Sequence, residues 1–470
     1  MSFFDQTATG EMTGEEVNNL QKALSAGYGT DSASFSGGRA LIPENLETEV
    51  MNVLAFAKED CKLMHTLKTQ PVRSTVHERN IRDDEGDFKH LTVTEGGQST
   101  ETSQSIKRKI FDMKYLQVKR GVTKQMEAAE TFEDALASEK ISGVNSVIKG
   151  AEYLCFHGDS AVVPTEFDGF ESQIRKAKAS ERNIISLRKS IGAAGTDYID
   201  EISELIYRQG GSADRMFFPP VLARDIRDTI FDSRGYYNLG AGVDLVNNFN
   251  GKPLPDYATA VGSNIKLSGD SAGADKFYTV KGKVVAEGDP QRRPAAPASV
   301  TAAASADTAG SQFVAAEAGD YKYTVHAVNQ YGISAGTEIV APVTVAAGGS
   351  VKLTITPGNG IGATGFIICR SNAGGNVVME MTKVPNSGNA TTEFVDKNEE
   401  LPGTASILFL TENKLTPTYK FAQLLPACTF PLAPTASAEI PFLVLMFGGL
   451  ELYAPKFCGI VKDIKYKGGL

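Results

Sequence analysis

Two short stretches of the chain contain residue types that could bind a cofactor or a metal. Gly360 to Gly365 matches the letters of the dinucleotide fingerprint, G-x-G-x-x-G, in which the N-terminus of a following helix holds the pyrophosphate. Residues 366–369 are β-formers, so these glycines predict a turn between strands. Cys155, His157 and Asp159 are metal-capable, but zinc or iron needs three or four ligands and no others lie nearby in sequence. They predict the turn that ends a helix.

A run of charges is the third candidate. Asp83, Asp84 and Glu85 could bind a cation, yet a solvated or ion-paired acidic turn is favoured. Basic residues flank this run on both sides, which suits charge pairing across a subunit boundary, and we predict inter-subunit contacts here. The predicted contact residues are Arg79, Arg82, Asp83, Asp84, Glu85, Lys107, Arg108 and Lys109.

Motifs of the common enzyme classes are missing from the sequence. It has no G-x-S-x-G elbow, P-loop or H-E-x-x-H. We therefore predict no catalytic residues, no metal site and no cofactor, and we do not expect an enzyme.

Composition narrows the class of protein. The 470 residues exceed the length of one hydrophobic core, so several domains are expected. No stretch approaches the roughly 18 apolar residues of a membrane span, and the N-terminus lacks a secretory signal, which predicts a soluble protein that stays in the cytoplasm where it is made. Five cysteines without a C-x-x-C pair indicate reduced thiols. A net charge of -9 and the absence of Trp argue against coating or sequence-specific reading of nucleic acid.

The N-terminal residues read as an arm. Residues 1–40 are polar and Gly/Ser-rich, with one short helix predicted from the capping box of Thr13 and Glu16. Such a tail becomes ordered by lying on the rest of the chain or on a neighbouring subunit. A second helix is predicted after Pro43. Its apolar stripe consists of Leu46, Val50, Val53 and Leu54.

Residues 69–124 predict a long β-hairpin. Charged residues alternate with β-formers, and residues 95–105 between them are turn-forming Gly, Ser and Thr. Arms of roughly 15 residues would reach about 50 Å, too far to fold back on a compact core. The hairpin would therefore lie on a partner, although a solvated two-stranded ribbon remains an alternative.

The rest of the chain predicts an α+β fold interrupted by an all-β unit. Apolar residues at helical spacing predict a long helix over residues 131–156, and helices alternate with short strands up to residue 290. Short strands at even spacing follow, with Tyr321, Tyr323, Val325 and Ala327 on one face, which is typical of an immunoglobulin-like or fibronectin III-like sandwich. Residues 403–470 are too few for a core of their own, so the sandwich is expected to be inserted.

This layout, with several short motifs, resembles the Hong Kong 97-type fold of tailed-bacteriophage major capsid proteins. Within that family the chain is similar to capsid proteins of large Twort-like myoviruses. The residues that carry the resemblance are Met113-Lys114-Tyr115, Phe156-His157-Gly158-Asp159, Glu166-Phe167-Asp168-Gly169, Val395-Asp396-Lys397-Asn398-Glu399, Leu401-Pro402, Leu424-Leu425-Pro426, Pro431-Leu432-Ala433 and Ala454-Pro455-Lys456.

The resemblance implies a role for each region. Residues 1–40 would be the N-arm, 41–68 a helical segment of the peripheral domain, and 69–124 the E-loop. Residues 125–190 would form the peripheral domain with its spine helix, 191–290 the axial domain, 291–402 the inserted sandwich, and 403–470 the return to the axial and peripheral domains.

The resemblance also implies partners and a location. Hexamers and pentamers of the chain would form the icosahedral phage head around double-stranded DNA, which would be contacted non-specifically. Portal and scaffolding proteins would be partners, a decoration protein is allowed, and no membrane is involved. The head would assemble in the bacterial cytoplasm and become part of the virion capsid.

Three rival functions remain open at this stage. An encapsulin-like compartment shares the fold but is usually shorter and lacks a sandwich. A phage tail or baseplate protein with a fibronectin-like module would form tubes or rings without pentamers. A hydrolase with a carbohydrate-binding sandwich would be an active monomer, and the missing catalytic motifs disfavour it.

Overall fold

The computed structural model describes residues 61–84, 86, 92–98, 101–128, 134–234, 257–270, 284–412, 417–434 and 438–466. The predictions for the N-terminal arm, for the two N-terminal helices and for Glu85 lie outside these residues. The described part holds helices and strands in alternation, so the α+β prediction is confirmed. No helix of the described residues is long and apolar enough to cross a membrane.

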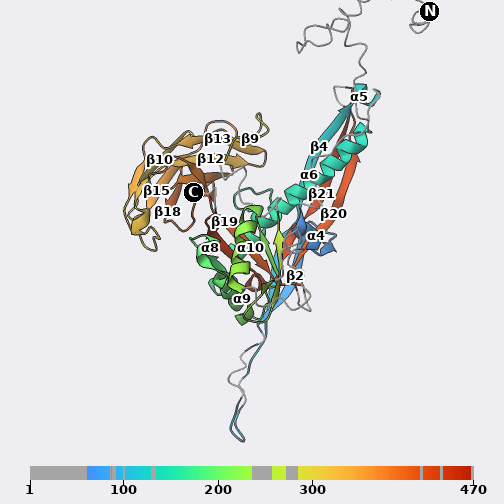
Figure 1. Ribbon diagram of the computed structural model, residues 1–470. Coiled ribbons are helices and arrows are strands. Elements are labelled where there is room, and N and C mark those ends of the chain that lie inside the picture. Colours follow the sequence, from blue (N-terminus) through green and yellow to red (C-terminus); the bar gives the residue numbers. More distant parts are fainter. Residues whose placement is uncertain are drawn as a thin grey trace, which may run out of the picture. The chain divides into compact units, whose positions relative to one another are not determined.

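A four-stranded sheet carries the longest helix on one face (Figure 1). Its order is β1 (Thr69–Pro71), β20 (Tyr419–Pro431), β21 (Glu439–Leu452) and β4 (Lys114–Thr123). The helix is α6 (Ala135–His157), which corresponds to the long helix predicted over residues 131–156. Val147, Ala151 and Leu154 of α6 share a hydrophobic core with Val444 and Met446 of β21.

Helix α6 ends where glycine becomes obligatory. A Cβ on Gly158 would collide with the carbonyl oxygens of Leu154 and Phe167, so no other residue fits this turn. The amide of Gly158 donates to Leu154 O at 2.9 Å and closes the last turn. The helix-terminal turn predicted around His157 is therefore confirmed.

The hairpin is shorter than the sequence predicts. Strands β2 (Val76–Asp84) and β3 (Ser105–Asp112) form their own two-stranded sheet with nine and eight residues. The predicted arms of about 15 residues are wrong, because the chain leaves the hairpin at the buried Met113 and enters β4. Leu116 and Val118 of β4 pack into the core beneath α6, so burial draws this strand into the larger sheet.

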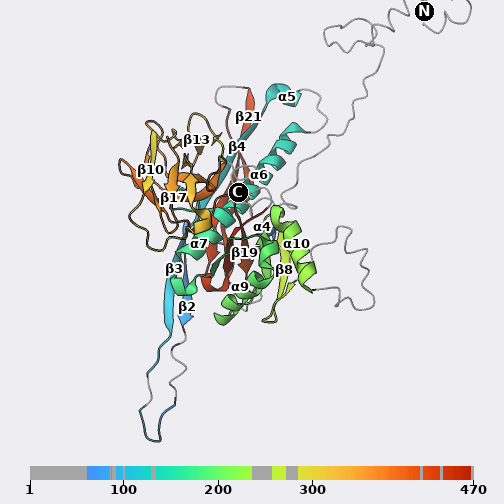
Figure 2. The same ribbon diagram turned by 60° about the vertical axis from the view of Figure 1, so that its left-hand side comes forward.

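A six-stranded mixed sheet holds the second core. Its order is β5 (Ile184–Ser186), β22 (Gly459–Ile464), β19 (Ala405–Leu410), β6 (Arg215–Phe218), β8 (Asn264–Gly269) and β7 (Tyr257–Ala258). Helices α8 (Ile191–Ala194), α9 (Asp197–Arg208) and α10 (Pro220–Arg234) pack beside it (Figure 2). The strands β19 and β22, which come from the C-terminal residues, lie inside this sheet next to β6 and β5.

Short elements connect these layers. They are α4 (Lys62–Thr66), α5 (Lys124–Ala128), α7 (Phe170–Lys176) and the 3-10 turns at Ala179–Glu181 and Pro455–Phe457.

The described residues between β8 and β19 form an all-β segment, apart from one 3-10 turn at Ala315–Glu317. One sheet has the order β10 (Ser299–Ala304), β15 (Val351–Thr356) and β18 (Thr392–Asp396). The other has the order β17 (Val378–Pro385), β16 (Gly365–Ser371), β12 (Tyr323–Asn329), β13 (Gly332–Glu338) and β9 (Glu287–Gly288), and a short pair joins β11 (Gly319–Tyr321) to β14 (Val343–Val345). Both larger sheets contribute to one core.

Three sequence predictions can be compared with this all-β segment. The predicted face of Tyr321, Tyr323, Val325 and Ala327 is buried in the shared core, as expected. The glycines at 360–365 join β15 to β16 with no helix after them, so the turn prediction is confirmed. The even spacing also predicts a strand over residues 339–345 and none over residues 332–338, which is wrong. Strand β13 occupies Gly332–Glu338, and only Val343–Val345 of the later range is a strand.

Candidate functional site

The hairpin brings several of the predicted contact residues together on two faces. In the register of β2 and β3, Arg79 lies opposite Lys109 and Ile81 opposite Lys107. Because direct cross-strand partners share a face, these residues form one face and Arg82 and Arg108 belong to the other. The side chains of Asp83 and Asp84, like Glu85, lie outside the described residues.

The first face of the hairpin is bound to the chain's own strand β21. The Arg79 guanidinium lies 4.0 Å from the centre of the Tyr453 ring, and Lys109 Nζ donates to the carbonyl oxygens of Leu452 and Tyr453 at 3.3 and 3.2 Å. His77 Nδ1 and the Tyr453 hydroxyl meet the two oxygens of the fully buried Glu451, each at 2.6 Å. Burial, with the hydrogen bond to Glu451, raises the pKa of Tyr453 above its usual range. Arg79 and Lys109 thus anchor the hairpin within its own subunit.

The second face of the hairpin is open. Ile106 is 57% exposed and Ile110 is 60% exposed. Between them Arg108 forms an ion pair with Glu78, and Arg82 is exposed nearby. Exposed aliphatic side chains with charged neighbours are typical of a surface that another protein covers.

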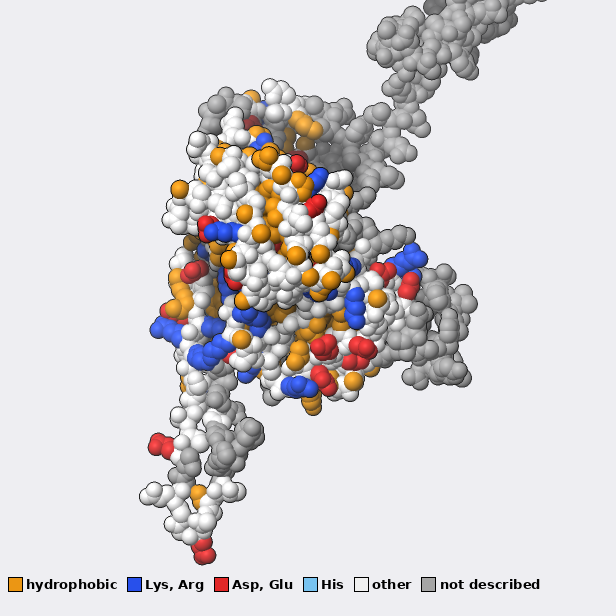
Figure 3. Space-filling model, turned by 90° about the vertical axis from the view of Figure 1, so that its left-hand side faces the viewer, with side chains coloured by type: hydrophobic (Ala, Val, Ile, Leu, Met, Phe, Trp, Pro, Cys, Tyr) orange, Lys and Arg blue, Asp and Glu red, His pale blue; other side chains and the backbone are white. Residues whose placement is uncertain are grey.

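A basic cleft of about 820 Å³ lies beside β3. Eight basic and three acidic side chains line it, so its charge is opposite to the net charge of the chain. Lys and Arg side chains also gather on the surface at the root of the hairpin (Figure 3). The basic lining residues are Arg82, Lys107, Arg108, Lys109, Lys114, Lys176, Lys178 and Lys456.

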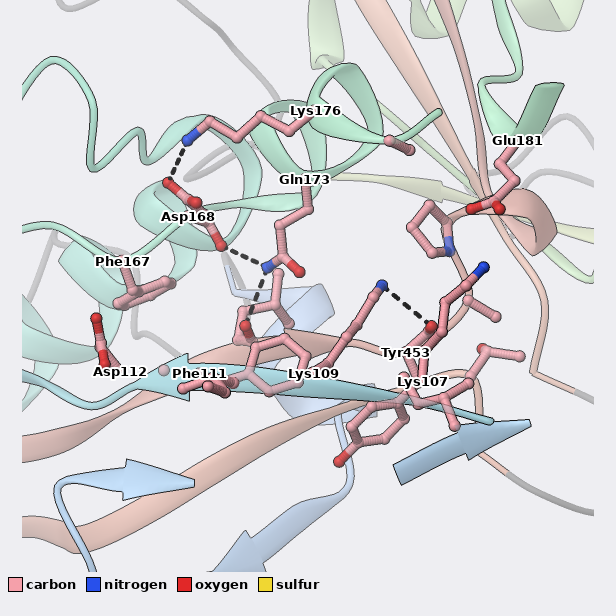
Figure 4. A pocket seen from close by; sticks show the side chains of 18 of the residues that line it. Lys107, Lys109, Phe111, Asp112, Phe167, Asp168, Gln173, Lys176, Glu181 and Tyr453 are labelled. Atoms are coloured by element: carbon pink, nitrogen blue, oxygen red, sulfur yellow. Dashed lines mark hydrogen bonds and ion pairs between the residues drawn. The ribbon is translucent and has the colours of Figure 1, made fainter. Parts of the chain in front are cut away.

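The wall of the cleft opposite β3 is held by hydrogen bonds (Figure 4). Lys176 Nζ lies 2.9 Å from Asp168 Oδ1, and Gln173 Nε2 donates to the carbonyl oxygens of Asp168 and Leu450 at 2.7 and 3.0 Å. Burial would raise the pKa of Asp168, but hydrogen bonds from Ser160 and Lys176 hold it below its ordinary value. Lys176 is thus paired within the wall, and the positive charge of the cleft comes from the excess of its other basic lining residues, which suits a carboxylate or phosphate.

A buried pair of carboxyl groups joins three distant segments. Glu152 of α6 accepts hydrogen bonds from the amides of Leu63 and Met64 at 2.8 and 2.7 Å, and Asp270 accepts one from Lys62 at 3.2 Å. Burial, followed by the hydrogen bond with Asp270, raises the pKa of Glu152 to about 9. Sequence reasoning missed this pair, because only the fold brings a helix interior and a strand end together.

The all-β segment packs on the rest of the chain through an apolar contact. Val162 and Val163, just after α6, pack with Val328, Ile367 and Cys369 on the outer face of the five-stranded sheet. For this reason strands β12 and β16 are buried on both faces. Arg175 strengthens the contact by pairing with Glu400 at 2.6 Å.

Cys155, His157 and Asp159, the metal-capable residues at the end of α6, each contact a different side chain. His157 Nδ1 lies 3.0 Å from Glu171, Asp159 pairs with Lys176, and the Cys155 sulfur contacts that of Met64. Within the described ranges, no group of three His, Cys, Asp or Glu side chains could hold a metal.

Sequence comparison finds relatives over almost the whole chain. A protein of Enterococcus phage phiEF24C, assigned as a major capsid protein, is 25% identical over 95% of this chain and 94% of its own. The major capsid proteins of Staphylococcus phages S25-3 and K are each 25% identical over 95% of both chains. No family model matches the chain.

Solved structures give weaker likenesses. A chain of Microbacterium phage Oxtober96 is 9% identical over 91% of this chain and 97% of that chain, with a TM-score of 0.46. The encapsulin of the holo-SrpI complex from Synechococcus elongatus is 8% identical over 91% and 96%, with a TM-score of 0.38. Both TM-scores lie below 0.5, so these structures carry no argument about this chain, and its similarity to known proteins is judged from the sequence relatives. Over 95% of its residues, this chain is similar in sequence to phage major capsid proteins.

Proposed function

We propose that the chain is the major capsid protein of a tailed bacteriophage and assembles into the hexamers and pentamers of an icosahedral head. The observation that carries the proposal is its similarity to major capsid proteins over 95% of both chains, since a shared module alone would give a local match. The virion capsid is its location.

A division of the chain in the manner of the Hong Kong 97-type fold fits this function. We assign the hairpin β2–β3 as the E-loop, α6 with the four-stranded sheet as the peripheral domain, and the six-stranded sheet with α8 to α10 as the axial domain. The open face with Ile106 and Ile110 and the basic cleft support contacts between subunits, because both are unlike an ordinary solvated surface.

The all-β segment is proposed as an immunoglobulin-like insertion on the outer surface of the head. Two sheets around one core and a low content of charged residues support this role. Portal and scaffolding proteins and the packaged DNA are the other expected partners. The basic cleft is the described surface best suited to an anionic one.

Electron microscopy of the expressed protein tests the proposal. We expect closed icosahedral shells with pentamers at the vertices. Tubes or rings of sixfold or threefold symmetry without pentamers would indicate a tail or baseplate protein. Empty cellular compartments that never take up nucleic acid in infected cells would instead indicate an encapsulin-like shell.

A pair of variants separates assembly from folding. Ile110→Asp places a charge on the open face of the hairpin and should abolish shells while leaving the melting temperature of the free subunit unchanged. Asn80→Asp lies on the same face near the exposed Arg82, and shells should still form. Shells from Ile110→Asp at the wild-type yield would contradict a role for this face in assembly.

A further inference from the structure

Three non-glycine residues among those described have a left-handed backbone, and all three lie where the all-β segment joins the six-stranded sheet. They are Arg188, Asn398 and Asp463, with φ of 55°, 59° and 59°. Arg188 follows β5, Asn398 follows β18, and Asp463 belongs to β22. This conformation costs free energy in residues other than glycine and persists where the surrounding contacts determine it. Their clustering indicates that the joint is held in one required geometry.

The side chain of Arg188 reaches from the six-stranded sheet into the all-β segment. Its guanidinium donates to the carbonyl oxygen of Gln312 at 3.1 Å and to that of Asn398. It also lies 3.8 Å from the carboxylate of Glu317. These acceptors come from two separate loops of the segment, so Arg188 contacts all of them only when the segment is folded.

Asn398 connects Arg188 to the buried charge pair of the segment. The side-chain oxygen of Asn398 accepts a hydrogen bond from Arg370 at 2.6 Å, and its side-chain nitrogen donates to Glu317 at 2.7 Å. Arg370 in turn pairs with Asp396 at 2.6 Å, and both are buried. Arg188 is therefore linked to side chains that cannot move without disturbing the core of the segment.

Asp463 holds the returning chain from the other side. Its carboxylate oxygens accept hydrogen bonds from the Leu401 amide at 2.9 Å and from the Ser186 hydroxyl at 2.6 Å. Next to it, Lys462 Nζ donates to the carbonyl oxygen of Glu399 at 2.9 Å. The residues that follow β18 are thus bonded to the six-stranded sheet and do not form a free linker.

A second attachment lies at the far end of the same strands. Val162 packs with Val328 and lies so close to Gly365 that a side chain there would not fit. Val328 and Gly365 are opposite each other in the register of β12 and β16, and Tyr323 and Arg370 are opposite each other five residues away. At roughly 3.3 Å per residue, the two ends are about 17 Å apart. Two attachments at this separation fix an orientation, whereas one alone allows rotation.

We infer that Arg188 is a positioning residue which, with Asn398 and Asp463, fixes the all-β segment at one angle to the six-stranded sheet. The segment is then rigidly attached and not flexibly linked. The inference goes beyond the proposed function, because the joint is present in a free subunit whatever the subunit builds. In a shell, it would give every copy of the segment the same orientation.

Amide exchange separates a loosened joint from a loosened segment. Arg188→Met keeps an unbranched side chain but removes the hydrogen bonds. The Leu401 amide, which is bonded across the joint, should then exchange at least about tenfold faster, as expected for the loss of hydrogen bonds from a charged group. Amides of β12 should keep their wild-type rates. An unchanged rate at Leu401 would overturn the inference, and so would faster exchange in β12, which would mean that the segment itself is destabilised.

Lys189→Met is the matched control for this measurement. It removes the same charge one residue later, at an exposed position. The Leu401 amide should keep its wild-type exchange rate in this variant. Equal acceleration by both variants would show that the loss of positive charge, and not the contacts of Arg188, loosens the joint.

Spin labels report the orientation of the segment directly. Asn359→Cys, in an exposed turn of the segment, and Tyr207→Cys, at the exposed end of α9, would carry the labels. Cys428→Ser removes the one native cysteine that is partly exposed, since the other four are buried. The distribution of distances between the labels should be narrow, and Arg188→Met should widen it at least about twofold. A distribution that is already wide without Arg188→Met, or that this change leaves narrow, would overturn the inference.

Electron microscopy of assembled heads extends the test. Heads of Arg188→Met should still close, but the density of the segment should be blurred relative to that of the shell. Equally sharp density for the segment in variant and wild type would contradict the inference. Failure of the wild-type chain to form heads would instead contradict the proposed function, while the exchange and spin-label measurements on free subunits would still decide the role of Arg188.

Discussion

At the scale of single residues, the buried carboxyl pair has the clearest pH consequence. The folded state keeps Glu152 protonated up to a pKa of about 9, whereas an unfolded glutamate loses its proton near 4.5. Between these values the folded state binds more protons than the unfolded state. The free energy of unfolding therefore falls as pH rises across this window, and the full contribution is present below about pH 4.5.

Replacing this carboxyl group should flatten that pH dependence. Glu152→Gln keeps the shape but cannot ionise, and its amide leaves one of the two backbone N–H groups at Leu63 and Met64 without an acceptor. At acidic pH we expect the free energy of unfolding to fall by about 1 kcal/mol relative to wild type. Between about pH 6 and 9, where Glu152 of the wild type titrates, the melting temperature of the variant should fall less than that of the wild type. Glu204→Gln, an exposed glutamate of α9, should retain the wild-type slope.

A second buried charge pair stabilises the all-β segment. Arg370 and Asp396 are each 2% exposed and lie 2.6 Å apart, and the Tyr323 hydroxyl also donates to Asp396 at 2.8 Å. Asp396→Ala would leave a buried guanidinium unpaired, so thermal unfolding should show a loss of about 3–5 kcal/mol. Glu393→Ala, in the same strand but exposed beside Lys352, should cost less than about 1 kcal/mol. Similar losses in both variants would contradict the argument.

At the scale of elements, the helices and strands that could be predicted are those whose buried apolar residues repeat at regular spacing in the sequence. The helix α6 and the inward face of β12 repeat apolar residues at helical or strand spacing, so both were predictable. Strand β13, with Gly332 and Gly336, lacks that alternation and was missed. The division between the hairpin and β4 depends on which core buries Leu116 and Val118, which is a tertiary property.

The candidate site was predictable in its residues but not in their partners. The crowding of basic side chains around residues 79–109 is visible in the sequence. That Arg79 and Lys109 face Tyr453 of the same chain is not visible, because only the folded chain brings the hairpin next to the end of β21.

This anchoring gives a prediction for the hairpin as an element. Lys109→Met removes two hydrogen bonds to the carbonyl groups of Leu452 and Tyr453 at the end of β21, so the hairpin should open locally more often. Amide exchange in β2 and β3 should become about tenfold faster, as expected for a loss near 1.4 kcal/mol. Arg108→Met removes the exposed ion pair with Glu78 on the opposite face and should change exchange less than about threefold. Faster exchange only in Arg108→Met would show that Lys109 does not hold the hairpin in place.

At the scale of the whole molecule, the all-β segment is joined to the rest of the chain through an apolar contact and through polar contacts such as the Arg175–Glu400 ion pair. Val162 and Val163 are buried against the outer face of the five-stranded sheet, whose own core lies on its other side. The segment therefore has a complete core without this contact. It should remain folded when the contact is broken, while its thermal unfolding should separate from that of the remaining chain.

Val162→Asp tests that separation. A carboxylate at this buried position cannot be solvated while the contact is closed, so calorimetry should resolve two transitions where wild type shows one. Ala161→Asp, one residue earlier and exposed, should keep the wild-type profile. If the proposed head assembles from Val162→Asp with the segment detached, the fixed attachment of the segment is dispensable for closing the shell. Loss of shells together with a normal subunit fold would mean that its fixed attachment is needed for assembly.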